Sequence, residues 1–485
     1  MVRSARVVLL TLLFTFPLVA QDIPFFTSDF TPQEFAARRE RIAEAIGPQA
    51  VAILQGAPAP DAYIRFRQWN EFYYLSGIEI PHAYLLIDGT TKKSTLFLPH
   101  RNVGRERGEG TVLSAEDADE VKKLSGIDQV GASEGLGEYL ARIARPGITR
   151  TIYTLLTPGE GFAMSRDLAL RAVADNAADP WDGRPMREGH FAQLLRERFP
   201  GFDIKDLTPT LDAMRVIKSP REIEMIKKAT RIACLAQMEA MRSTKPGIME
   251  YELDAVAKYI FYRDRAQGEA YFSLIQSGPN AMFGHYNAGK RRMNDGEFLL
   301  FDFAPDYGYY MSDVTRMWPV NGKFNSWQKE LYGFYVGCYK AVLDAIRPGV
   351  TAQTIIQEAL RAMDGLLAKT KFSKPVYEHG AHAFVDAYRR SAENPKASLG
   401  HWVGMATHDD GIDTGPLRPG MVFTIEPPLR VPEENINIRC EDLIVVTQSG
   451  RDVVSADILP LEMDKIEKIM KEEGLLQKYP PDNGM

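Results

Sequence analysis

Cysteine is scarce in this chain of 485 residues, which contains only Cys234, Cys338 and Cys440. An odd count with no CxxC spacing argues against a disulfide framework, and it excludes a metal site built from thiolates. Positive charge is not in excess either, because the formal net charge at pH 7 is −6. This mild acidity argues against a nucleic acid as the partner.

A hydrophobic run long enough to cross a membrane is also missing from the N-terminus. Arg3 and Arg6 precede an apolar run over residues 7–16, and the small residue Ala20 stands before Gln21. The run is shorter than the roughly 20 residues that a transmembrane helix needs. The pattern is typical of a secretory signal at residues 1–20. We therefore expect export, to the periplasm or out of the cell, with no stable membrane span after cleavage. The alternative is a retained anchor if cleavage fails.

The rest of the chain has the composition of a soluble globular protein, with 45% apolar and 25% charged residues. Its length favours two domains. Short apolar runs predict strands at 50–54, 84–87, 96–98 and 151–155, and they alternate with helices predicted at 32–46, 114–124 and 136–145. We expect an α/β domain at residues 21–206.

The second half, residues 207–485, is predicted to begin with a connector at 207–217. Ser219-Pro220-Arg221-Glu222 is a capping box that predicts the start of a helix, which ends before Pro246-Gly247 and is followed by another helix from residue 249. About a hundred residues later, a helix over 327–346 ends before Pro348-Gly349 and another helix follows. This repetition suggests two related halves that supply strands to one shared site.

Two acids stand out in the first of these halves. Asp302 ends the apolar run Phe298–Phe301, and Asp313 lies in a second expected strand over 309–318, after an Asp-Tyr-Gly turn. A hairpin can hold both carboxylates on one face. Because buried like charges repel, a divalent cation between them is the usual solution.

The second half supplies further potential ligands. His401 stands among small and apolar residues, Glu426 ends the apolar run 421–425, and Glu441 lies in the expected strand 438–446, where Arg439 shares its face. Each acid alone reads best as a surface charge at a strand end, and the histidine alone as a core residue. Together, four carboxylates and one imidazole suit two divalent ions of the Mn, Co or Zn type.

These five residues, with the strings Ser312-Asp-Val-Thr-Arg316, Pro419-Gly-Met-Val and Ile438-Arg-Cys-Glu-Asp442, resemble the pita-bread metallopeptidases of the creatinase/aminopeptidase fold. Upstream, Glu71-Phe-Tyr-Tyr-Leu-Ser-Gly77 followed by Pro81 is similar to the N-terminal domain of aminopeptidase P and prolidase. The resemblance therefore implies an α/β N-terminal domain followed by an α+β pita-bread catalytic domain.

The resemblance also implies roles for single residues. Asp302 would chelate one metal, His401 and Glu426 would bind the other, and Asp313 and Glu441 would bridge the two. A bridging hydroxide would attack the scissile carbonyl, with Glu426 accepting its proton. Catalytic contributions are implied for His285, a substrate contact, and for His408, a hydrogen-bond partner of the peptide carbonyl or oxyanion. Arg439 would steady the neighbouring carboxylates.

The chain departs from the family pattern at two places. Ala397 stands where the family commonly has a histidine that lines the proline pocket, which argues against strict proline selectivity. His379 and His382 are alternatives for that histidine, but their spacing does not support them. Arg430 replaces an aromatic residue, and it could either salt-bridge a loop or meet a peptide carboxylate.

The sequence therefore predicts an exported Xaa-Pro aminopeptidase with two divalent metal ions, Mn first and Co or Zn next, that acts on peptides. Xaa-Pro dipeptidase (prolidase) is the first alternative, and a metal-free binding scaffold of the same fold is the second. A homodimer or homotetramer is compatible with the resemblance.

Overall fold

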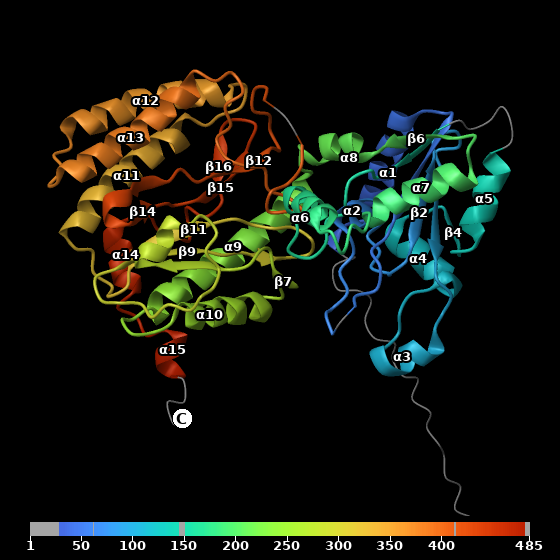
Figure 1. Ribbon diagram of the computed structural model, residues 1–485, viewed down its shortest axis with the longest axis horizontal. Coiled ribbons are helices and arrows are strands. Elements are labelled where there is room, and N and C mark those ends of the chain that lie inside the picture. Colours follow the sequence, from blue (N-terminus) through green and yellow to red (C-terminus); the bar gives the residue numbers. More distant parts are fainter. Residues whose placement is uncertain (1–28, 62, 145–150, 412–413, 481–485) are drawn as a thin grey trace, which may run out of the picture.

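The computed structural model describes residues 29–61, 63–144, 151–411 and 414–480, which form two lobes (Figure 1). The first lobe contains the α/β elements of the N-terminal half, and the second contains the rest of the chain. The predicted signal at residues 1–20 lies outside the described residues. Within the part of the chain that is described, no helix combines the length and apolar character needed to span a membrane. The boundary between residues 206 and 207 stays a prediction.

The first lobe is built around a six-stranded mixed sheet. Its elements in chain order are α1 (Pro32–Ile46), β1 (Ala50–Gln55), α2 (Asn70–Ser76), β2 (Tyr84–Asp88), β3 (Ser94–Leu98), α3 (Val103–Glu109), the 3₁₀ turn η2 (Ala115–Asp117), α4 (Ala118–Ser125), β4 (Gln129–Ala132), α5 (Gly135–Ile143), β5 (Thr151–Thr154), α6 (Arg166–Ala178), α7 (Arg187–Arg198) and β6 (Asp203–Asp206). The strands lie in the order β4-β3-β2-β1-β5-β6, and β1 pairs antiparallel with β2 and parallel with β5. The predicted α/β architecture is confirmed.

Helix α1 begins as its sequence predicts, with one difference in the cap. The Thr31 side chain accepts a hydrogen bond from the backbone N–H of Glu34 at 3.3 Å, and Pro32 occupies the first helical position. The Glu34 carboxylate does not return to the cap. It instead accepts hydrogen bonds from Arg38 at 2.9 Å and from the Ser219 hydroxyl at 2.7 Å, so it ties α1 to the second lobe.

The second lobe combines small antiparallel sheets with long helices. Its elements are α9 (Pro220–Ser243), α10 (Glu250–Arg263), β7 (Gly268–Glu269), β8 (Leu274–Ser277), η3 (Gly278–Met282), β9 (Phe298–Asp302), β10 (Pro305–Asp306), β11 (Thr315–Pro319), α11 (Ser326–Ala345), α12 (Ala352–Lys369), α13 (Pro375–Ala392), β12 (Val422–Ile425), β13 (Leu429–Val431), η4 (Pro432–Glu434), β14 (Ile436–Ile438), β15 (Asp442–Val446), β16 (Arg451–Val453), α14 (Met463–Ile469) and α15 (Leu475–Lys478). Helix α8 (Thr208–Arg215) precedes them in the chain and packs against α1 of the first lobe. The connector predicted at 207–217 is wrong, because Leu211 and Met214 share a buried helical face there and form α8.

Two three-stranded antiparallel sheets, β8-β9-β11 and β12-β15-β16, meet at the centre of this lobe. Thr315 and Glu441 join the sheets through two backbone hydrogen bonds, at 2.9 and 3.3 Å. Helix α9 packs against α10, and α11 packs against α12, which fits the predicted repetition. In Figure 1 the strands lie between these two groups of helices. The joined sheet edges are where the predicted ligands gather.

A buried interface fixes the two lobes against each other. Arg67 of the first lobe bonds Asp306 at 2.7 Å, and both side chains are almost fully buried. The ring of Tyr309 stacks on Tyr73 with centroids 3.5 Å apart, and its hydroxyl accepts a hydrogen bond from the Gln68 backbone at 2.9 Å. Buried contacts of this kind hold the neighbouring helix α6 in a fixed place beside the second lobe.

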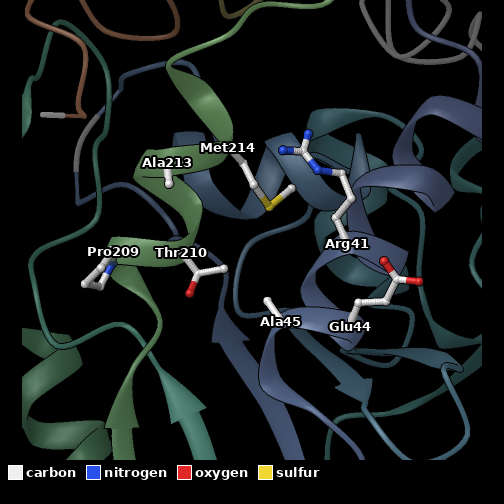
Figure 2. Close-up of a pocket in the computed structure, with 7 residues that line it drawn as sticks. All are labelled: Arg41, Glu44, Ala45, Pro209, Thr210, Ala213 and Met214. Atoms are coloured by element: carbon white, nitrogen blue, oxygen red, sulfur yellow. The ribbon is translucent and has the colours of Figure 1, made fainter. Parts of the chain in front are cut away.

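An open hollow of about 540 Å³ lies between α1 and α8 (Figure 2). Its lining includes the Arg41 and Glu44 side chains, together with small and apolar residues of α8. It contains none of the residues that the sequence predicts for the site. The chemistry therefore has to be sought in the second lobe.

Candidate metal centre

Asp302 and Asp313 come together as predicted, but from different kinds of backbone. Asp302 is the buried last residue of β9 and lies opposite Thr315 of β11. Asp313 was predicted on the second strand, which is wrong: it lies in the loop before β11. Before this loop the chain leaves β9 and pairs with β7 through β10. Tyr309 then has a left-handed backbone (φ 72°), and the Met311 N–H bonds the Gly404 carbonyl at 2.8 Å.

A tyrosine joins the two aspartates. The buried hydroxyl of Tyr271 lies 2.6 Å from Oδ1 of Asp302 and 2.6 Å from Oδ1 of Asp313. Burial, followed by the charges of these carboxylates, raises the pKa of Tyr271 well above its usual value. The hydroxyl therefore stays protonated and holds the two acids at a fixed separation.

His401 faces the aspartates from the loop beside β12. A Cβ at Gly400 would lie 2.1 Å from the Thr424 carbonyl oxygen, so only glycine lets this loop lie so close to the strand. Nδ1 of His401 lies 3.2 Å from the Trp402 carbonyl oxygen, which orients the ring. Nε2 lies 3.2 Å from Oε1 of Glu426, the residue directly after β12.

Glu441 completes the set from a break between two strands. The expected continuous strand 438–446 is wrong, because the pairing stops after β14 and resumes at β15. The expected alternation persists, however: Arg439 and Glu441 reach the carboxylate cluster, whereas Cys440 is buried with its sulfur 3.6 Å from the Tyr332 hydroxyl. Thr315 donates a hydrogen bond to Oε2 of Glu441 at 2.7 Å.

The five predicted ligands thus converge. Asp313, His401 and Glu441 each offer one ligand atom, and these atoms all lie within 4.8 Å of one another. Nε2 of His401 lies 3.5 Å from Asp313 and 3.9 Å from Glu441. Asp302 and Glu426 adjoin this triad through Tyr271 and His401, respectively.

The electrostatics of the cluster fit a cation. Burial and then the charge of Asp302 raise the pKa of Asp313 well above its usual value, and burial and then Asp313 do the same for Glu441. Oε1 of Glu441 is buried and, among the described residues, has no hydrogen-bond partner. Divalent metal ions would relieve both the repulsion and this unpaired oxygen. The residues present therefore fit the metal ions that the sequence predicts.

Arg439 contacts the cluster where a supporting residue was predicted. Its guanidinium donates hydrogen bonds to Asp302 and, at 3.1 Å, to Glu426. Burial opposes the charge of Arg439, but Asp302 and Glu441 outweigh burial and raise its pKa. In the same way, burial favours the neutral form of Glu426, yet the His401 hydrogen bond and Arg439 lower the pKa of Glu426. Glu426 is therefore held as a carboxylate that can accept a proton.

The two other predicted histidines line the cavity above the cluster, which has a volume of about 220 Å³. His285 is exposed there, between η3 and β9. The ring of His408 lies 4.3 Å from that of His401, and its Nδ1 lies 3.2 Å from the Asp167 carboxylate of α6. Burial and then His401 lower the pKa of His408. The first lobe thus contributes directly to this cavity.

The residues considered for proline-pocket or carboxylate contacts all lie outside the cavity lining. His379 and His382 are exposed on α13 and do not line the cavity, so neither replaces the missing histidine. Arg430 is exposed on β13 and is also outside the lining. Ala397 lines a separate cavity of about 210 Å³ behind the His401 loop. The expectation that one of these side chains supplements the site is not supported.

Sequence reasoning missed three residues of the site. Tyr271 lies in a short irregular link between β7 and β8, Thr315 reads as an ordinary strand residue, and Asp167 belongs to the other lobe. Neither Tyr271 nor Asp167 stands in a pattern that marks it. The Thr315-Arg316 pair after Asp313 was the only available signal, as part of the string that carries the family resemblance.

Comparisons with known proteins agree with this geometry. Residues 224–448 match the family model described as metallopeptidase family M24, and residues 35–153 match the aminopeptidase P N-terminal domain. The chain is 29% identical to an Escherichia coli Xaa-Pro aminopeptidase (91% of this chain, 98% of the relative) and 27% identical to a human Xaa-Pro dipeptidase (93% and 95%). It resembles the solved structure of E. coli aminopeptidase P with the inhibitor Pro-Leu, with a TM-score of 0.72 and 28% identity over 91% of this chain and 98% of that one.

Proposed function

Because this chain is a metallopeptidase of family M24 with an aminopeptidase P-type N-terminal domain, we propose that it is an Xaa-Pro aminopeptidase. It would release the N-terminal residue from peptides that have proline in second position. The observation that carries the proposal is the convergence of Asp313, His401 and Glu441, with Asp302 and Glu426 beside them, at a cavity of about 220 Å³ that all of them except the buried Glu441 line.

The residues that would hold the metal ions are the four carboxylates and the one imidazole named above. Bound divalent ions supply a water of lowered pKa and an electrophile for the scissile carbonyl. Glu426, which His401 and Arg439 keep ionised, would accept a proton of the attacking water. His285 and His408 contact the peptide from the cavity wall, and Asp167 orients the His408 ring through Nδ1. Tyr271 and Arg439 hold the carboxylates in place.

The alternative is an Xaa-Pro dipeptidase, which one human relative is called. A second cavity of about 420 Å³ adjoins the first and shares Ala163, Tyr271 and Phe272 with it. This space leaves room for more than two residues, which favours the aminopeptidase. The metal-free scaffold is set aside, because the chain is an Xaa-Pro aminopeptidase-like hydrolase.

The proposal also covers the metal, the domain bounds, the location and the assembly of the protein. Manganese is the proposed metal, since carboxylate-rich sites with one imidazole accept it. The domain bounds are proposed at residues 21–206 and 207–485. Export is proposed from the charged and apolar pattern of residues 1–20. A homodimer or homotetramer is the proposed assembly.

The direct experiment compares Ala-Pro-Ala-amide, Ala-Pro-Ala and Ala-Pro as substrates of the manganese-loaded protein, with and without chelator. Chelator-sensitive release of alanine from the tripeptides supports the proposal, whereas cleavage of Ala-Pro alone supports the dipeptidase. Glu441→Gln should lower kcat/KM by about a thousandfold or more, because it removes one charge at a shared ligand. Substantial remaining turnover in this variant would contradict the role proposed for Glu441.

A further inference from the structure

One wall of the cavity is formed by α6 of the first lobe, through Asp167, Leu168 and Arg171. Asp167 and Arg171 are four residues apart, so they lie on the same face of the helix. Asp167 contacts His408, and Arg171 lies one turn further along, a rise of about 6 Å. Arg171 therefore stands beside the reaction site but one helical turn away from it.

Arg171 differs from the other arginine of the cavity. Arg439 is committed to Asp302 and Glu426. Arg171 is exposed, and within the described parts of the chain it forms neither a hydrogen bond nor an ion pair with any side chain. Its guanidinium is thus free to bind a ligand group. The remaining charged lining of the cavity is mainly acidic, through Asp167, Asp302, Asp313 and Glu426.

The charges of a peptide match this arrangement. A short peptide carries an ammonium at one end and a carboxylate at the other. A guanidinium repels the ammonium and binds a carboxylate through two parallel hydrogen bonds. An extended peptide covers about 3.3 to 3.6 Å per residue, so two residues beyond the scissile bond span roughly the rise from Asp167 to Arg171.

We propose that Arg171 binds the C-terminal carboxylate of short peptides and so makes this enzyme select tripeptides with a free C-terminus. This inference rests on the proposed function, since it concerns the leaving part of the same substrates. It assigns to α6 the carboxylate recognition that was one of two alternatives for Arg430, whose side chain is exposed on β13 outside the cavity.

The test measures kcat and KM for three peptides, Ala-Pro-Ala, Ala-Pro-Ala-amide and Ala-Pro-Glu-amide, with the manganese-loaded protein. We expect the wild type to prefer the free acid Ala-Pro-Ala over its amide by about tenfold in KM, the worth of one charge-assisted contact in a partly exposed place. Arg171→Gln should raise KM for the free acid by a similar factor and leave both values for the amide unchanged. Arg430→Gln is the matched control and should behave as the wild type.

Binding provides a readout without turnover. Calorimetry should show that the product Pro-Ala binds the wild type about tenfold more tightly than Pro-Ala-amide, and that Arg171→Gln removes this difference. Equal KM for acid and amide in the wild type, or a preference that survives Arg171→Gln, would overturn the inference. A preference for Ala-Pro-Glu-amide over Ala-Pro-Ala would also overturn it, because the side-chain carboxylate would then be the ligand.

The failure of this inference is distinguishable from failure of the proposed function. If every variant cleaves the amide while Arg171→Gln leaves KM for the free acid unchanged, the peptidase function is supported. The carboxylate contact of Arg171 is then contradicted. If no Xaa-Pro peptide is cleaved by the metal-loaded wild type, the proposed function itself falls. Arg171 is exposed, and thermal melting should show that the variant is as stable as the wild type.

Discussion

At the scale of single residues, the proposed metal centre depends on side chains that touch the predicted ligands without being ligands themselves. Tyr271 contacts two aspartates, Arg439 contacts Asp302 and Glu426, and Thr315 bonds Glu441. Each of these side chains hydrogen-bonds to a buried carboxylate. The carboxylate positions that remain free then face the point where the ligands converge. A buried carboxylate without such a partner would turn toward any available donor.

Tyr271→Phe tests this positioning. The change keeps the ring and removes only the hydroxyl, so Asp302 and Asp313 lose a shared donor. We expect manganese affinity or kcat/KM to fall about 10- to 100-fold, the usual effect of losing a group that supports a ligand. Metal titration followed by activity measurements would show this. Tyr377→Phe, whose hydroxyl bonds Glu434 at 2.7 Å away from the cavity, is the matched control and should change neither quantity.

Only some of the residues at the site could be predicted from the sequence. Asp302, Asp313, His401, Glu426 and Glu441 could be found because each carries chemistry and sits beside an apolar run. Tyr271 could not be found, since a tyrosine in a loop has many ordinary uses. His379 and His382, the candidates to replace the missing histidine, lie outside the cavity lining, as does Arg430, because the sequence does not say which face of α13 or β13 meets the cavity.

At the scale of elements, helix starts that carry a side-chain cap were predictable, whereas the uncapped start of α8 and the breaks in strands were not. Capping residues Ser219 and Thr351 act through contacts three residues away, so the sequence contains the whole motif for α9 and α12. The ends of β11 and β14 depend instead on partners far along the chain, such as the pairing of Thr315 with Glu441. The loop that carries Asp313 is shaped by Gly404, which no local pattern could indicate.

A surface histidine that contacts two glutamates in the first lobe allows a prediction at the scale of elements. His100, after β3, lies 2.6 Å from Glu116 of η2 and 2.8 Å from Glu134 before α5. Hydrogen bonds that the His100 ring donates to Glu116 and then Glu134 raise the pKa of His100 above its usual value. A raised folded-state pKa adds stability that is fully present below the unfolded value and is lost as pH rises through the folded value.

His100→Gln should therefore lower the melting temperature more at pH 5.5 than at pH 8.5. The measurement is the difference in melting temperature between wild type and variant across this range, at low salt, where exposed charges act most strongly. His190→Gln on α7 is a matched control. A difference that grows toward high pH would contradict the role of His100.

At the scale of the whole molecule, the two lobes act as one active unit. The α6 helix of the first lobe supplies Asp167 and Arg171 to a cavity whose floor belongs to the second lobe. Contacts such as Arg67 with Asp306, 239 positions apart in the sequence, hold the lobes in this arrangement. The sequence predicted both folds, but it could not predict this contact, because nothing local links residues so distant along the chain.

We propose that five side chains from separate segments of the chain form a centre for divalent metal ions. Its most direct test is the manganese content of the purified chain after loading and removal of free metal, measured by mass spectrometry of the metal. We predict about two ions per wild-type chain and a clear loss of bound metal in Glu441→Gln. The melting temperature should rise with metal, because an ion that binds only the folded state stabilises it by about 2.7 kcal/mol at 100 times its dissociation constant. A folded wild-type chain that retains no divalent metal and melts at the same temperature with and without it would contradict the claim.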